Sequence, residues 1–236
     1  MLPTDGVAAW LDALASPAPT PGGGGAAALT LAQAAALLAM ACRLTLGKEK
    51  YASTHAQVAQ VLDDVEAVRQ AAQTLAAEDA QAFQKVMDAY ALPRQGEGAA
   101  AARNLAIQAA LEESAGIPLA VYQLSGLLLL EGGPVRILEQ AGNPALASDV
   151  AVGRILALAS LHASLENLRA NTVLIKEPGL VSALEQELIY TDQLEQWNRE
   201  LMEHGNTSPA SGTLPPPGPG LRTRVGQILR EFLPGT

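Results

Sequence analysis

The chain has 236 residues, enough for a large domain with a substantial buried core. Apolar residues make up 49% of it and aromatic residues only 3%, so Ala, Leu and Val must fill most of the core, which favours closely packed helices over sheets. The net charge of -9 argues against nucleic acid as a partner, because phosphate binding needs concentrated Lys and Arg.

Glycine and proline divide the chain into predicted helices. In chain order these span about residues 5–14, 24–46, 54–91, 99–130, 134–140, 144–176 and 179–203, and an interruption or kink is expected at 116–118. Asn143 is a plausible N-cap and Pro144 fits the first helical position after it. No convincing strand is present. The predicted fold is an all-α bundle of long, partly kinked antiparallel helices.

Composition changes sharply after the last long helix. Residues 205–220 read GNTSPASGTLPPPGPG, which is typical of a flexible linker, and a short helix is expected within residues 221–236. The predicted organisation is therefore a helical domain over residues 1–204, a Pro/Gly-rich linker and a short helical tail.

Two apolar segments resemble membrane spans. Residues 117–130 are too short to cross a bilayer, whereas residues 26–46 are Ala-rich, carry Gln33 and Arg43, and are expected to be buried, often a sign of a subunit contact. The N-terminus has no basic region, so we expect a cytoplasmic protein without a membrane partner. The lone Cys42 is expected to be a buried thiol in a reducing compartment.

The helix predicted over residues 54–91 carries an apolar stripe with a carboxylate in it. The stripe consists of Val58, Val61, Val65, Val68, Ala72, Leu75, Phe83, Val86 and Tyr90. Asp79 occupies the turn between Leu75 and Phe83. A carboxylate on an inward face is costly unless it has a partner or a purpose. Asp79 is therefore either an ion-paired or capping residue, or a functional acid or base.

The helix after Pro144 places polar side chains at both of its ends. One face carries Asp149, Gly153, Leu156, Ser160, Ala163, Asn167 and Leu174, with Asn171 one turn beyond Asn167. Asp149 and Asn167 are about 27 Å apart along this helix. Either the ligand is elongated, or each end belongs to a different site across an oligomer. The alternative for Ser148 and Asp149 is a purely structural role, in which they interact favourably with the helix dipole in the first turns of this helix.

Four glycines, residues 22–25, lead into the helix predicted to start at residue 24 or 25. Glycines leave backbone N–H groups unobstructed, and the positive end of the helix dipole favours an anion or a ligand carbonyl there. The alternative is a tight turn that lets two helices approach. After the same helix, Lys48 and Lys50 either cap its C-terminal end or meet substrate carboxylates. His55, His162 and His204 do not cluster, and no Cys/His spacing suits zinc, so no metal site is predicted.

Five segments together resemble the cyclodeaminase domain of formiminotransferase-cyclodeaminase and its stand-alone bacterial relatives, some of them methenyltetrahydrofolate cyclohydrolases. They are PTPGGGGAAAL, LTLGKEKY, DAQAFQKVMDAYALP, AGNPALASDVAVGRILALA and NLRANTVLIKE, within about residues 16–176. The resemblance implies a helical bundle, a homodimer and tetrahydrofolate chemistry with no cofactor beyond the folate substrate. The chain departs from the family at Gly25 and Arg94, where members commonly have Ser and Lys, and at Glu166 and Arg169, which flank Asn167.

The resemblance also implies roles for individual residues. Asp79 and Asp149 are expected to handle protons and stabilise charge. The residues expected to bind substrate are Pro21, Gly22, Gly23, Gly24, Lys48, Lys50, Arg94, Asn143, Ser148, Asn167 and Asn171. Among these, the two lysines and Arg94 are expected to face the glutamate tail of the folate, which can carry several glutamates, because its carboxylates require cations.

The expected reaction is cyclodeamination of 5-formiminotetrahydrofolate to 5,10-methenyltetrahydrofolate and ammonia. Hydrolysis of 5,10-methenyltetrahydrofolate to 10-formyltetrahydrofolate is the alternative. Two further alternatives are a non-catalytic helical scaffold that pairs with another chain, such as a separate formiminotransferase, and a folate-binding protein without turnover.

Overall fold

The computed structural model describes residues 6–176. Its helices are α1 (Gly6–Leu14), α2 (Gly23–Leu46), α3 (His55–Ala91), α4 (Ala99–Leu129), α5 (Pro134–Ala141) and α6 (Ala147–Thr172), with two 3-10 segments, η1 (Glu49–Thr54) and η2 (Pro144–Leu146). No strand occurs in this part of the chain, and the prediction of an all-α bundle is confirmed. The linker, the tail and the helix predicted over residues 179–203 lie outside the described residues.

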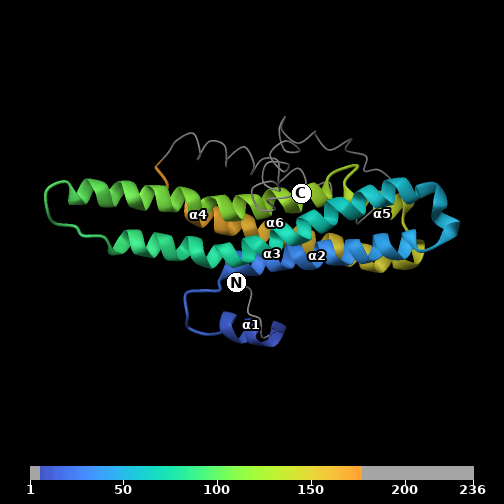
Figure 1. Cartoon of the computed structure of the whole chain (residues 1–236), viewed down its shortest axis with the longest axis horizontal. Helices are drawn as coiled ribbons and strands as arrows, with labels where there is room; N and C mark the ends of the chain where they lie inside the picture. Colours follow the sequence, from blue (N-terminus) through green and yellow to red (C-terminus); the bar gives the residue numbers. More distant parts are fainter. Residues whose placement is uncertain (1–5, 177–236) are drawn as a thin grey trace.

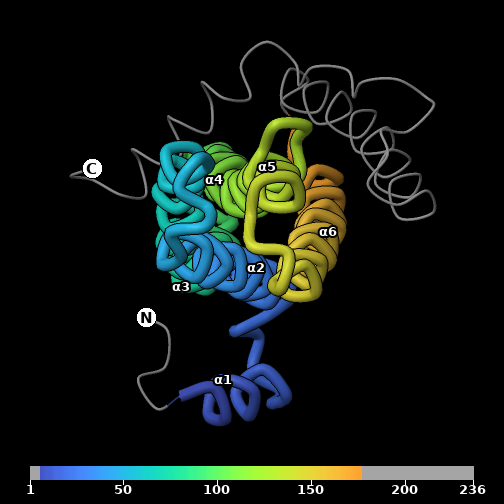
Figure 2. The backbone as a smooth tube through the Cα atoms, turned by 90° about the vertical axis from the view of Figure 1, so that its right-hand side faces the viewer, coloured from blue at the N-terminus to red at the C-terminus, as the bar shows by residue number. Residues whose placement is uncertain are grey.

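Four long helices form the bundle. α2 packs against α3 and α6, and α4 packs against the same two helices (Figures 1 and 2). Small side chains allow the close approach of α2 and α6: a Cβ on Gly153 would lie 3.1 Å from Leu38 Cδ2. Between these helices, the Ser160 hydroxyl donates a hydrogen bond of 2.8 Å to the carbonyl of Ala27. Cys42 is fully buried, as predicted.

Two helix boundaries differ from the prediction. α4 continues through Pro118 without a break, and buried neighbours such as Ile117 and Val121 hold this stretch in the core despite the missing N–H; a kink at this proline stays a prediction. α6 ends at Thr172 rather than near residue 176. The chain leaves the helix there because the carboxamide of Gln108 donates to the Leu174 carbonyl and accepts from the Lys176 N–H.

The apolar stripe of α3 is buried only where other helices cover it. Its first six residues, from Val58 to Leu75, are fully or almost fully buried. Phe83 is 36% exposed and Tyr90 39% exposed, so the expectation that they face the core is wrong. The reason is that α2 begins at Gly23, beside Asp79, and leaves the following part of α3 uncovered on that side.

Three segments are long and apolar enough to cross a membrane by length and composition alone: residues 23–46, 99–141 and 144–172. In the first two, 61% and 72% of the apolar window is buried inside the bundle, so core packing accounts for their composition. In the third only 28% is buried, and Val152 and Ile155 are exposed. This third segment is not among the two apolar segments predicted from the sequence to resemble membrane spans.

Helix α1 stands apart from the bundle (Figures 1 and 2). None of its residues is buried, and Val7 is 77% exposed. A groove of about 780 Å³ separates α1 from α2, lined by Val7, Trp10 and Leu11 on one side and by Leu29 and Ala36 on the other. The segment between α1 and α2 includes a cis peptide bond before Pro21.

Candidate active site at the start of α2

The carboxylate of Asp79 lies against the first turn of α2. The Gly25 N–H donates a hydrogen bond of 2.9 Å to Asp79 Oδ2. A Cβ built on Gly24 would lie 2.0 Å from Asp79 Oδ1, far inside van der Waals contact. Only glycine fits at residue 24 while the carboxylate is in this position. The glycine run thus allows α3 to place an acid directly on the positive end of the α2 dipole.

Asn167 lies on the other side of the same turn. Its Nδ2 donates to the Ala163 carbonyl at 2.8 Å, and its Oδ1 would be 3.1 Å from a Cβ on Gly23. Within residues 6–176 the N–H groups of Gly23 and Gly24 have no hydrogen-bond acceptor. Two free backbone donors, a carboxylate and a carboxamide oxygen are therefore gathered at one place from three helices.

Burial raises the pKa of Asp79, and the hydrogen bond from Gly25 partly opposes that increase. A carboxyl group with a raised pKa is a better proton donor to a substrate than an ordinary aspartate. As a carboxylate, Asp79 also stabilises a cationic carbon centre beside it. The glycine amides offer complementary donors to a developing negative charge.

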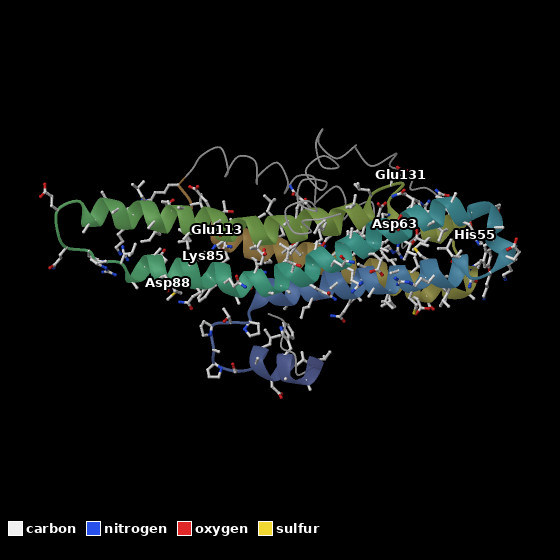
Figure 3. All side chains as sticks on the ribbon, viewed as in Figure 1. His55, Asp63, Lys85, Asp88, Glu113 and Glu131 are labelled. Atoms are coloured by element: carbon white, nitrogen blue, oxygen red, sulfur yellow. The ribbon has the colours of Figure 1, made fainter. Side chains whose placement is uncertain are left out.

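Other predicted site residues lie at the opposite end of α2, roughly 30 Å away by helical rise. Asn143 is buried there and caps η2, its Oδ1 accepting from the Tyr51 hydroxyl at 2.8 Å and from the Ala145 N–H at 3.2 Å. Its N–H donates to Thr45 Oγ1, and Lys50 Nζ lies 4.7 Å from the centre of the Tyr51 ring. This is the end at which Figure 3 labels His55.

The sequence matches the family model Formiminotransferase-cyclodeaminase over residues 6–189. The chain belongs to this family. A methenyltetrahydrofolate cyclohydrolase of Methylorubrum extorquens is 39% identical over 171 residues, which is 72% of this chain and 81% of that protein. A crystal structure of formiminotetrahydrofolate cyclodeaminase from Thermotoga maritima superposes with a TM-score of 0.69 at 24% identity, covering 98% of this chain and 96% of that one, a likeness that shows the fold. The expected family and enzymatic character are confirmed.

In this member of the formiminotransferase-cyclodeaminase family, the predicted site residues fall into separate groups. Residues 21–24, Asp79 and Asn167 meet at the start of α2, and Asn171 lies one turn beyond Asn167 on α6. Lys48, Lys50, Asn143, Ser148 and Asp149 lie toward the other end of the bundle, and Arg94 is exposed in the loop between α3 and α4. A single chain does not bring Asp79 and Asp149 together.

The unusual charges beside Asn167 in this family member form a pair of their own. The Arg169 guanidinium donates to the Glu166 carboxylate, and both side chains are exposed. They leave Asn167 free to face the glycine turn.

Arg103 of α4 was not predicted as a site residue. Its guanidinium carbon lies 5.7 Å from the centre of the Tyr90 ring, and nothing in the local pattern of the sequence indicates this pairing.

Proposed function

We propose that the protein hydrolyses 5,10-methenyltetrahydrofolate to 10-formyltetrahydrofolate. The observation that carries this proposal is the Asp79 carboxylate held by Gly25 at the start of α2, with Asn167 opposite. The cyclohydrolase named among the relatives, at 39% identity, supports the same reaction. Cyclodeamination, the reaction expected from the sequence, is the second candidate, because the relative that shares 39% identity is named a cyclohydrolase.

The reaction requires one group that accepts and returns a proton. Water adds to the bridging carbon of the methenyl cation and loses a proton; the bond from that carbon to N5 then breaks, the hydroxyl proton leaves as the carbonyl forms, and N5 takes up a proton. One proton is released overall. In the proposal, Asp79 accepts the proton of the attacking water and returns one to N5, a role that suits the raised pKa of this carboxyl.

The surrounding groups position the reactants. The ionised Asp79 attracts the cationic carbon before water attacks, and the Asn167 oxygen accepts a hydrogen bond from that water or from the pterin edge. The free N–H groups of Gly23 and Gly24 donate to a pterin carbonyl or to the oxygen of the tetrahedral intermediate. All the groups that the proposed reaction uses therefore lie at the start of α2 and on the turns of α3 and α6 that face it.

Cyclodeamination remains the second candidate, supported by the family description. In that reaction N10 of 5-formiminotetrahydrofolate attacks the formimino carbon, N10 loses its proton, and ammonia leaves after its nitrogen is protonated. Asp79 would carry the proton from N10 to the departing nitrogen. The two reactions thus use the same carboxylate and differ in the nucleophile.

Assays of the purified protein with both folates test the proposal. We expect loss of the methenyl absorbance with 5,10-methenyltetrahydrofolate; ammonia release from 5-formiminotetrahydrofolate would favour the second candidate instead. Asp79→Asn should lower kcat at least a hundredfold, the usual scale of a general acid–base contribution. Asp88→Asn, a matched change at an exposed position of α3, should leave the rate unchanged. Turnover of neither substrate would refute both assignments.

A further inference from the structure

Helices α3 and α4 extend well beyond the start of α2 (Figure 1). Asp79 marks the level at which α2 begins, and α3 continues to Ala91, roughly 18 Å further at the α-helical rise. The face of α3 that α2 covers before Asp79 is open after it. This open strip starts at the candidate active site and runs toward the loop between α3 and α4.

The open strip carries Phe83, Met87 and Tyr90. Their spacing of four and three residues continues the stripe of Asp79, and they are 36%, 47% and 39% exposed. Large apolar side chains in contiguous exposed positions are a mark of a binding surface. In a chain whose residues are only 3% aromatic, two aromatic side chains within about three helical turns of the acid are a notable concentration.

Cationic groups lie at the far end of the strip. Arg103 reaches across from α4, with its guanidinium carbon 5.7 Å from the centre of the Tyr90 ring and Nη2 donating to the Tyr90 carbonyl at 3.0 Å. Within residues 6–176 this is the only hydrogen bond of that guanidinium, so it keeps further donors. Arg94 is exposed just past the end of α3. Neither arginine forms an ion pair with a described carboxylate.

We propose that this strip binds the p-aminobenzoylglutamate arm of the folate, an inference that rests on the proposed function. The aromatic ring of the arm packs on Phe83 and Met87, and its glutamate carboxylates meet Arg103 and Arg94. The order of groups along α3 matches the order along the substrate: reacting carbon at Asp79, aromatic ring next, carboxylates last. This assigns the glutamate end to the α3–α4 hairpin and away from Lys48 and Lys50.

Titration calorimetry with two stable ligands tests the proposal. One is 5-formyltetrahydrofolate, and the other is the matching pteroate, which lacks the glutamate. We expect the wild-type protein to bind the glutamate-containing ligand at least tenfold more tightly, because charged hydrogen bonds to the carboxylates are lost with the truncated one. Arg103→Gln should remove most of that preference. Arg94→Gln, at an exposed position that leaves the hairpin folded, should reduce it.

Matched control variants separate a loss of contacts to the glutamate from a general loss of charge or of apolar surface on the hairpin. Lys85→Gln removes a cation from the same hairpin, where Lys85 pairs with Glu113 (Figure 3), and should leave the preference unchanged. Phe83→Ala should weaken both ligands about tenfold, because the lost aromatic contact is common to them. Leu105→Ala, at a 73% exposed position on α4, should weaken neither.

The outcomes distinguish the two proposals. If 5-formyltetrahydrofolate binds and the Phe83, Arg94 and Arg103 variants bind both ligands like the wild type, the arm lies elsewhere and this inference is wrong, while the proposed function stands. If the wild-type protein binds no folate, the proposed function itself fails.

Discussion

At the scale of single residues, Asp79 combines a function with a cost to stability. Burial disfavours its charged form and raises its pKa, and one backbone hydrogen bond from Gly25 compensates only in part. A group whose pKa is raised on folding contributes most below its unfolded pKa, and that contribution is lost as pH rises through the folded pKa. At neutral pH, the ionised Asp79 therefore lowers the stability of the fold.

This cost predicts that Asp79→Asn stabilises the folded protein at neutral pH although it lowers kcat. Asn retains an oxygen that accepts from the Gly25 N–H but carries no charge to desolvate. Thermal unfolding should give an equal or higher Tm for the variant near neutral pH, and the advantage should vanish below about pH 4, where the wild-type carboxyl is protonated. A Tm several degrees lower than wild type at neutral pH would contradict this account.

At the scale of elements, the packing of the first turn of α2 against α3 depends on Gly24 more than on the neighbouring Gly25. Gly24→Ala forces a methyl group into the Asp79 carboxylate, with 2.0 Å between Cβ and Oδ1, and we expect it to cost about 1–3 kcal/mol and to displace the acid. Gly25→Ala is the matched control, because its Cβ would lie 3.5 Å from the Ala76 carbonyl, an ordinary contact. Urea unfolding and the cyclohydrolase assay should show Gly24→Ala impaired in both, and Gly25→Ala close to wild type. Equal loss in the two variants would refute a specific role for Gly24.

Helix positions were largely predictable because Gly and Pro end helices through local backbone chemistry. Gly47, Pro93 and Pro134 each mark a boundary within a residue or two of the observed one. Pro118 does not end α4, since a proline inside a well-packed helix is tolerated when its neighbours are buried. The end of α6 depends on Gln108, about 65 residues earlier in the chain, and no local pattern contains that contact.

The candidate site was predictable to the extent that its residues break an otherwise apolar pattern. Asp79 and the glycine run interrupt such patterns, and the structure brings them together with Asn167. The exposure of Phe83 depends on where α2 begins, and the pairing of Arg103 with Tyr90 depends on where α4 lies beside α3; neither can be read from the sequence of α3. A stripe on a single helix shows which residues share a face, but it does not show how far a neighbouring helix covers that face.

At the scale of the whole molecule, long helices separate groups that the sequence suggested might act together. Asn167 and Asp79 both lie at the start of α2, beside Gly23 and Gly24, whereas Asp149 is about 27 Å from Asn167 along α6. Within one chain, Asp79 and Asp149 are therefore too far apart to touch one reacting carbon. Asp149 and Lys48 can contribute to the site of Asp79 only from a second copy of the chain. The oligomeric state therefore decides whether these two residues can take part in catalysis.

We expect the protein to be a homodimer in which α1 and the exposed side of α2 are covered by the second copy. In the single chain α1 buries none of its residues, Val7 and Leu11 are 77% and 51% exposed, and the groove beside α2 is lined by apolar side chains. The same patch on both copies makes a self-complementary interface, as two-fold symmetry requires. Light scattering should give about twice the 24.4 kDa of one chain. The double change Val7→Asp and Leu11→Asp should give a folded monomer, because neither residue contributes to the core, whereas Leu105→Asp on the distant hairpin should remain dimeric. A wild-type monomer at micromolar concentration, or a dimer that survives the α1 changes, would show that this face has another purpose.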